Sequence, residues 1–134
     1  MASFVINGVD DLIHDIESLY NADEIAIKAV NEAAEIMDTE LKKEIKSATH
    51  KYGTGQLAAS IHHVKPKKND LGIFTASTAR GRDNKGVRNH DKLYYLEYGT
   101  TRQNPAPVVA RAVNKAEKAV LEKLQEVFDR ETKL

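Results

Sequence analysis

The sequence predicts an α+β domain, in which a small antiparallel β-sheet is packed by a long N-terminal helix and a C-terminal helix. Apolar residues recur at steps of three and four in two long stretches, at 27–48 and 109–127. Between them, from residue 61, the composition changes toward strand-forming residues. Helices and strands that are segregated along the chain are typical of α+β packing. The length of 134 residues fits a single domain covering 1–134.

Two helices are expected first. Asp10 or Asp11 can cap a short helix whose apolar face comprises Leu12, Ile13, Ile16, Leu19 and Tyr20. Asn21 or Asp23 can cap a second helix of about six turns. Its stripe comprises Ile27, Val30, Ala34, Met37, Leu41, Ile45 and Ala48. Two glycines within 52–55 then end the helical pattern.

A brief helical turn at 57–60 leads into the strand region. Strands are predicted at Ile61–Lys65 and Leu71–Ala79, joined by a hairpin loop at Pro66–Asp70 that is rich in turn formers. The second strand is the stronger prediction, with Phe74 and Ala76 on one face. A small sheet leaves an edge free, and pairing between subunits is a natural use of that edge.

The rest of the chain, from residue 80 onward, is expected to form a loop, a strand and a helix. Residues 80–92 should form a long polar loop, because Val87 is the only large apolar residue in 80–91. Leu93–Tyr98 returns to strand character, and Gly99 ends it. The last helix begins at 105–107, with Pro107 suited to its first turn, and runs to about Asp129. Its stripe comprises Val109, Val113, Ala116, Val120, Leu124 and Val127.

Composition excludes several classes of protein. Without cysteine the chain forms no disulfide, thiolate nucleophile or cysteine-based zinc site. We expect neither a secreted precursor nor a membrane protein, because no basic start precedes a long apolar run and no stretch approaches a membrane span.

The zero net charge hides an asymmetry. Residues 62–92 hold eight Lys or Arg against three Asp, so this segment carries +5 and the rest of the chain −5. Such a basic middle suits solvated loops, an acidic partner or nucleic acid. The candidate partner-binding cations are Arg80, Arg82, Lys85, Arg88 and Lys92.

No pattern indicates catalysis, a metal or a cofactor. The five histidines lack metal-ligand spacing, and His62 and His63, adjacent on a predicted strand, face opposite ways. Neither a nucleophile elbow nor a P-loop occurs. We therefore expect a protein that is not an enzyme.

Two short passages of the chain carry recognisable motifs. One is a T-G-x-L-x-x-S-I run, carried here by Thr54, Gly55, Leu57, Ser60 and Ile61. The other is an E-[F/Y]-G-T signature that leads through a proline turn into a C-terminal helix, carried here by Glu97, Tyr98, Gly99, Thr100 and Pro107. Both motifs resemble those of a family of tail-component proteins from long-tailed phages. With the helix before Thr54, the resemblance covers about 25–127. Val108 departs from the family's usual Phe after the second proline.

The resemblance implies a tail-completion subunit, similar to the tail-to-head joining protein of a phage with a Gram-positive host. Such subunits are assembled in the host cytoplasm and act as rings, commonly of six, at the head–tail interface of the virion. The implied partners are further copies of the chain, the tail tube protein and the head connector or stopper protein. Genomic DNA passes through the channel without sequence-specific binding. The motif residues themselves are expected to be mainly structural.

Two further hypotheses concern the basic middle of the chain. Residues 80–92 are expected to be mobile in the free subunit and to become ordered on assembly, because they are polar and lack apolar anchors. As an alternative function, a DNA-binding accessory protein would use the cations of 62–92 to contact phosphates.

Overall fold

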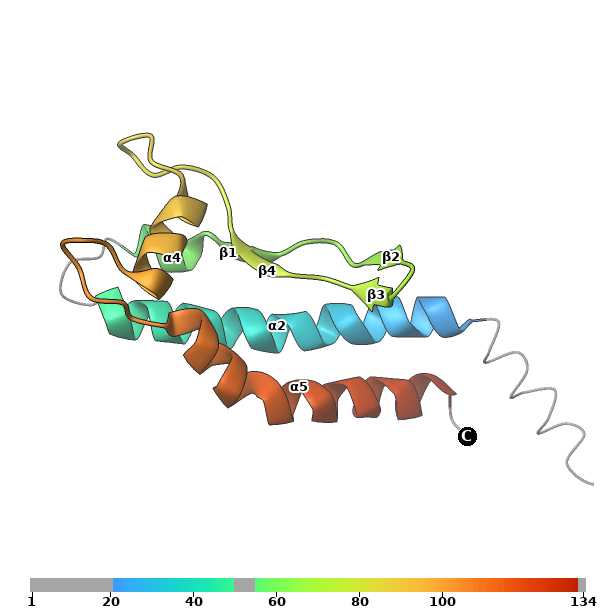
Figure 1. The fold of residues 1–134 in the computed structure, drawn as a ribbon. Coiled ribbons are helices and arrows are strands. Elements are labelled where there is room, and N and C mark those ends of the chain that lie inside the picture. The colour runs from blue at the N-terminus through green and yellow to red at the C-terminus, as the bar shows by residue number, and fades with distance from the viewer. Residues whose placement is uncertain (1–20, 50–54, 133–134) are drawn as a thin grey trace, which may run out of the picture.

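The computed structural model describes residues 21–49 and 55–132. The helix expected at 10–20 and the motif residue Thr54 lie outside these residues. The predicted α+β class is confirmed: two long helices lie side by side in opposite directions, and an extended β-hairpin follows the other side of the first (Figure 1). These helices are α2 (Ala22–Thr49) and α5 (Val108–Thr132).

The start and stripe of α2 follow from its sequence. The Asn21 carbonyl accepts the first helical bond, from the Ile25 amide at 3.0 Å. The negative charges of Asp23 and Glu24 lie in the first turn, where they interact favourably with the positive end of the helix dipole. Of the predicted stripe, Leu41 and Ile45 are fully enclosed, whereas Ile27 remains exposed. The apolar stripe is therefore fully buried toward the C-terminal end of α2 and becomes exposed near its N-terminal end, at Ile27.

The hairpin is longer and more interrupted than predicted. It contains β1 (Ile61–His63), β2 (Lys67–Asn69), β3 (Gly72–Phe74) and β4 (Ser77–Ala79). β1 pairs with β4, and β2 pairs with β3, both antiparallel. The predicted strand at Leu71–Ala79 is thus divided into β3 and β4, whereas the one at Ile61–Lys65 is shortened to β1. Most of the predicted loop at Pro66–Asp70 is strand β2.

Pro66 explains the interruption, because proline has no N–H to donate to the ladder. Between the two paired parts, the Val64 amide donates to the Ala76 carbonyl at 3.0 Å, and the Thr75 hydroxyl donates to the Val64 carbonyl. The actual turn lies at 70–71, where the Asn69 side chain accepts the Leu71 amide at 2.8 Å.

The strand predicted at Leu93–Tyr98 is wrong: these residues belong to a helix, α4 (Asn89–Tyr98). Strand alternation would place Leu93 and Leu96 on opposite faces, whereas the helix buries both on one side. Core burial of this pair therefore prevails over the strand preference of the tyrosines. Because α4 begins at Asn89, the polar loop covers 80–88 rather than 80–92.

The last helix also differs slightly from expectation. Pro107 immediately precedes α5, and its carbonyl accepts the Arg111 amide at 3.0 Å. The helix runs to Thr132, beyond the predicted end at Asp129. The helical turn expected at 57–60 is α3 (Gln56–Ala59).

The core gathers at the end of the molecule that holds α3 and α4 (Figure 1). Its members come from α2, α3, α4 and α5 and from β1 and β4: Leu41, Ile45, Ala58, Ile61, Ala79, Leu93, Leu96, Val108 and Ala112.

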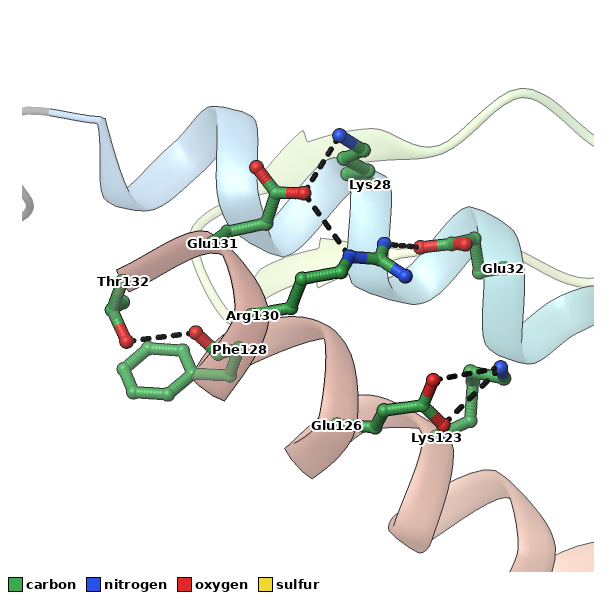
Figure 2. A network of polar contacts seen from close by, with 8 residues as sticks. All are labelled: Lys28, Glu32, Lys123, Glu126, Phe128, Arg130, Glu131 and Thr132. Atoms are coloured by element: carbon green, nitrogen blue, oxygen red, sulfur yellow. Dashed lines mark hydrogen bonds and ion pairs between the residues drawn. The ribbon is translucent and has the colours of Figure 1, made fainter. Parts of the chain in front are cut away.

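At the opposite end, ion pairs join α2 to α5 (Figure 2). Lys28 contacts Glu131 at 2.7 Å, and Arg130 contacts Glu32 at 2.6 Å. No helix in the described parts of the chain is long and apolar enough to cross a membrane.

Candidate interaction surface

The polar loop at 80–88 has a hydrogen-bond framework of its own, organised by Asp83. The Asp83 carboxylate accepts the Lys85 amide at 2.8 Å and the Val87 amide at 2.9 Å. The Asp83 amide in turn donates to the Val87 carbonyl at 2.8 Å. The loop lacks apolar anchors, as predicted, but backbone hydrogen bonds fix its course. Its mobility in the free subunit stays a prediction, which amide exchange at Asp83 and Val87 tests.

Asn89 fastens this loop to α4. Its side-chain amide donates to the Arg80 carbonyl at 2.8 Å, and its backbone amide donates to the Gly81 carbonyl at 3.0 Å. The side chain is buried. Lys92, one turn further along, forms an ion pair with Asp83. The hydrogen bond from Lys92, followed by that from the Val87 amide, lowers the pKa of the Asp83 carboxyl below its ordinary 3.8.

Two of the five predicted partner-binding cations are engaged within the chain. Lys92 pairs with Asp83, and Arg88 makes two bonds to Asp91, at 3.1 and 2.8 Å. The hydrogen bond to Asp91 also raises the pKa of the Arg88 guanidinium above its ordinary value. These two residues position the loop and present little free charge.

The other three cations remain available at the loop. Arg80 donates to the His63 carbonyl at 3.3 Å, and Arg82 donates to the Gly86 carbonyl at 2.8 Å. Within the described residues, neither they nor Lys85 lies in an ion pair. All three are exposed. Among these five cations, those without an ion pair therefore all lie at 80–85.

Beside the loop, α4 displays three tyrosines that the sequence analysis placed on a strand. Tyr94, Tyr95 and Tyr98 are 56%, 49% and 68% exposed. The Tyr94 ring contacts the Tyr98 ring at a centroid distance of 4.9 Å and the Tyr95 ring at 6.1 Å. Tyrosine and arginine are the residues most enriched at the energetic centres of protein interfaces. We call Arg80, Arg82, Lys85 and these three tyrosines the Tyr–Arg surface.

Glu97, the acidic residue of the second motif, caps α5. Its carboxylate accepts the Val109 amide at 2.7 Å and the Ala110 amide at 3.3 Å. These amides belong to the first turn, where helix N–H groups lack intrahelical partners and favour negative charge. Glu97 therefore fixes the end of α4 to the start of α5.

Gly99 and Thr100 shape the connection between those helices. Gly99 has φ 77°, and a Cβ there would lie 2.8 Å from the Pro105 nitrogen. Its amide ends α4 by donating to the Tyr95 carbonyl at 2.8 Å. The Thr100 amide then donates to the Gln103 carbonyl at 2.9 Å. Tyr98, by contrast, is 68% exposed and is the large exposed side chain of this motif.

The first motif builds the adjacent corner. Gly55 precedes α3 with φ 84°, and Ser60 donates its hydroxyl to the Leu57 carbonyl at 2.6 Å. Leu57 packs on the core, and Ile61 is fully buried within it. These residues have structural roles.

The histidines show no metal-binding arrangement in the described ranges, where no group of three potential ligands occurs. His63 lies between Asp38, at 2.6 Å from Nδ1, and Asn31, at 2.8 Å from Nε2. Asp38 also accepts the Ser77 hydroxyl at 2.6 Å. This cluster joins the hairpin to α2. That the protein is not an enzyme stays a prediction.

No family model, curated protein or solved structure matches the chain.

Proposed function

We propose that the chain is a structural subunit of a ring at the head–tail interface of a long-tailed phage, where it joins the preassembled tail to the DNA-filled head. It works through surface complementarity rather than catalysis. Its proposed partners are further copies of itself, in a ring of about six, the tail tube protein and the head connector or stopper protein. DNA passes through the ring without sequence-specific contacts.

The meeting of the two motif passages in one corner of the fold carries this proposal. They are about 40 residues apart in the sequence. In the fold, Ala58 and Ile61 of the first passage share one buried cluster with Leu96 and Val108, which directly flank the second. A signature that builds a single structural unit supports a common fold more strongly than two short unconnected matches would.

That corner also presents the Tyr–Arg surface. The core side of α4 is anchored by Leu93 and Leu96, so its opposite side offers the tyrosines to a partner. The anchored helix and the hydrogen-bonded loop limit the conformational entropy that binding would remove. The surface therefore suits a rigid joint between subunits.

The hairpin supplies a second kind of contact. β2 and β3 pair with each other as a two-stranded sheet in the described part of the chain, so their outer edges offer unpaired backbone groups. Strand addition along such an edge is a common way to extend a sheet across an interface. We propose that this edge contributes to closure of the ring.

Complementation of tails that lack the protein tests the proposal. The variant carries Tyr94→Ser, Tyr95→Ser and Tyr98→Ser, which remove exposed rings without touching the core. We expect unchanged thermal unfolding, loss of ring assembly on the tail end and loss of joined particles. The matched control carries Lys118→Ser and Glu122→Ser on the exposed side of α5. Normal joining by the tyrosine variant would contradict the proposal.

The DNA-binding alternative predicts a different result from the same material. If the isolated protein binds duplex DNA with an affinity that falls steeply with salt, and ignores the tails, the accessory role replaces the ring subunit. Arg80→Ser with Arg82→Ser and Lys85→Ser would then weaken DNA binding. The internal pairing of Arg88 and Lys92 argues against this alternative, because two of the five loop cations are already neutralised.

A further inference from the structure

An open apolar groove lies between α2, β3 and α5, with a volume of about 470 Å³. It is lined by Val30 and Met37 of α2 and by Phe74 of β3, and α5 contributes Val113 and Leu121. Phe74, Val113 and Leu121 are 44%, 46% and 59% exposed. Apolar side chains from three elements thus converge on one hollow. An apolar group that enters it would be stabilised in proportion to the area buried.

The tip of the hairpin carries a large apolar side chain in an unusual place. Leu71 is 96% exposed, more than any other large apolar side chain in the described ranges. It stands in the turn between β2 and β3, where Gly, Asn, Asp, Pro and Ser normally predominate. A leucine there adds nothing to the core of its own chain. Departures of this kind from local sequence rules are expected at functional positions.

This turn is held in place from both sides. The Asn69 side chain accepts the Leu71 amide at 2.8 Å, and Gly72 follows with φ 127°, a conformation that favours glycine. The hairpin runs along α2 (Figure 1), and Lys68, beside the turn, contacts Asp23 of α2 at 2.6 Å. Leu71 therefore projects from a fixed base, so its insertion into a partner would remove little conformational entropy.

We propose that Leu71 of one copy of the chain enters the groove of a second copy. Within one chain the two features do not meet, since Leu71 is almost fully exposed while Phe74, three residues further along the paired hairpin, lines the groove. The tip and the groove are different patches, so each copy can give one tip and receive another. Head-to-tail contacts of this kind close into a ring where the rotation between copies allows it. The inference rests on the proposed ring and names one contact between its subunits.

The charges of the tip and the groove are complementary. Glu117 is the charged residue that lines the groove, and it forms no ion pair with another described residue. Residues 65–71 hold three lysines and one acid, Asp70, so the tip carries +2. Lys68 is already paired with α2, whereas Lys67 is exposed and lies in no ion pair within the described parts of the chain. Lys67 of the entering tip is therefore the cation available to Glu117 of the receiving copy.

The size of this contact sets its strength. Stable interfaces between proteins bury about 1,200–2,000 Å² in total, and one inserted side chain with its neighbours buries far less. The free protein should therefore associate only weakly through Leu71. In a ring, where other surfaces hold neighbouring copies together, the same contact would fix their relative orientation.

Disulfide trapping between two single-cysteine variants of the full chain tests the contact, because the natural chain has no cysteine to interfere. Leu71→Cys is mixed with Leu121→Cys or with Val113→Cys, and different mass labels separate mixed dimers from like pairs. One control mixes Leu71→Cys with Glu35→Cys, an exposed position on α2 outside the groove. The other mixes Val87→Cys, an exposed apolar position of the 80–88 loop, with the same two groove variants. We expect at least one groove mixture to form the mixed dimer about tenfold faster than both controls, the order that burial of one leucine supports.

An exchange of charges tests the pairing of Lys67 with Glu117. Glu117→Lys in the receiving copy should slow the trapping severalfold, and Lys67→Glu in the entering copy should do the same. When the two changes are combined in one mixture, opposite charges meet again and the rate should recover. Glu122→Lys, on the exposed side of α5, is the control and should leave the rate unchanged. Thermal unfolding of each variant checks that the fold is retained.

Either of two results would overturn the inference. If no groove mixture reacts faster than the Glu35→Cys control, Leu71 does not enter the groove. If Val87→Cys reacts with the groove variants as fast as Leu71→Cys does, the groove accepts any exposed apolar side chain and the tip has no special role. These tests use the isolated protein, so their failure leaves the joining role to be decided by complementation of tails. Conversely, a protein that traps through Leu71 but ignores tails would lose the joining role and keep this contact.

Discussion

The two ends of the α2–α5 pair differ in the interactions that stabilise them. At the end with α3 and α4, buried apolar side chains from several elements fill one cluster, and Ile45, Ile61 and Val108 have no exposed surface. At the other end, Val127 is also buried, but exposed ion pairs join the helices (Figure 2). An open groove also lies between α2, β3 and α5. We call these the closed end and the open end.

This difference indicates how stability and binding are divided in the molecule. Apolar burial contributes most of the free energy of folding, whereas exposed ion pairs contribute little each. The closed end therefore supports the Tyr–Arg surface on a rigid base. The open end retains apolar surface whose burial awaits an occupant.

The largest expected effect comes from breaking the closed end. Ile61→Ala removes three buried carbon atoms and leaves a cavity, which should lower the free energy of unfolding by about 2–5 kcal/mol. Leu121→Ala, at the exposed wall of the groove, is the matched control and should cost less than about 1 kcal/mol. Urea unfolding of both variants measures the comparison. Equal costs at the two sites would show that the open end is as well packed as the closed one.

A substitution at Gly99 tests the connection that the second motif builds. Gly99→Ala places a Cβ 2.8–2.9 Å from backbone atoms of Pro105 and Gln103, at a φ of 77°. We expect a loss of about 1–3 kcal/mol. Gly86→Ala is the matched control, because Gly86 has φ 82° but nothing within 4 Å of the added Cβ. If thermal unfolding gives the same loss for both, steric crowding at Gly99 has no role beyond backbone strain.

Glu97 tests the cap on α5, with a smaller expected effect. Glu97→Ala leaves the Val109 and Ala110 amides without their carboxylate, which should cost about 1 kcal/mol. Glu97→Gln keeps an acceptor and should recover part of that loss. Glu122→Ala, on the exposed side of α5, should have almost no effect. Denaturant unfolding measures the free energy of unfolding of each variant. A loss for Glu122→Ala as large as that for Glu97→Ala would contradict the capping role of Glu97.

The sequence predicted the long helices well, because their stripes of apolar residues repeat over many turns. It failed at 93–98, where three tyrosines favour a strand and the decisive signal is the three-residue spacing of Leu93 and Leu96. It also missed that Pro66 divides the hairpin without ending it. Periodicity identifies a long element securely, but over six residues both periods fit.

The candidate surface was only partly predictable. The basic loop was recognised by its charge, yet the pairing of Lys92 with Asp83 depends on α4 being a helix that turns back toward the loop. The exposed tyrosines were missed for the same reason, since their exposure depends on which side of α4 faces the core. Nor does a stripe reveal that part of it lines an open groove, because the pattern specifies an apolar face and not what covers it.

The smallest effect is expected at the open end, from its ion pairs. The hydrogen bond from Lys28 lowers the pKa of the Glu131 carboxyl below its ordinary 4.5, with a smaller contribution from Arg130. A lowered carboxyl pKa contributes stability above the ordinary value, and this contribution is lost as the pH falls through the lower, folded-state pKa. Both partners are substantially exposed, so solvent screens the pair.

Glu131→Gln should therefore shift the unfolding midpoint less than Glu97→Ala does at neutral pH and low salt. The shift should disappear as the pH falls below the lowered folded-state pKa of Glu131, where the wild-type carboxyl is protonated. It should also disappear at 1 M salt, where the Debye length is about 3 Å. Thermal unfolding across pH and salt measures both trends, with Glu122→Gln as the control. A shift that persists in 1 M salt would mean that Glu131 acts through packing, and the two ends would then differ less than their contacts indicate.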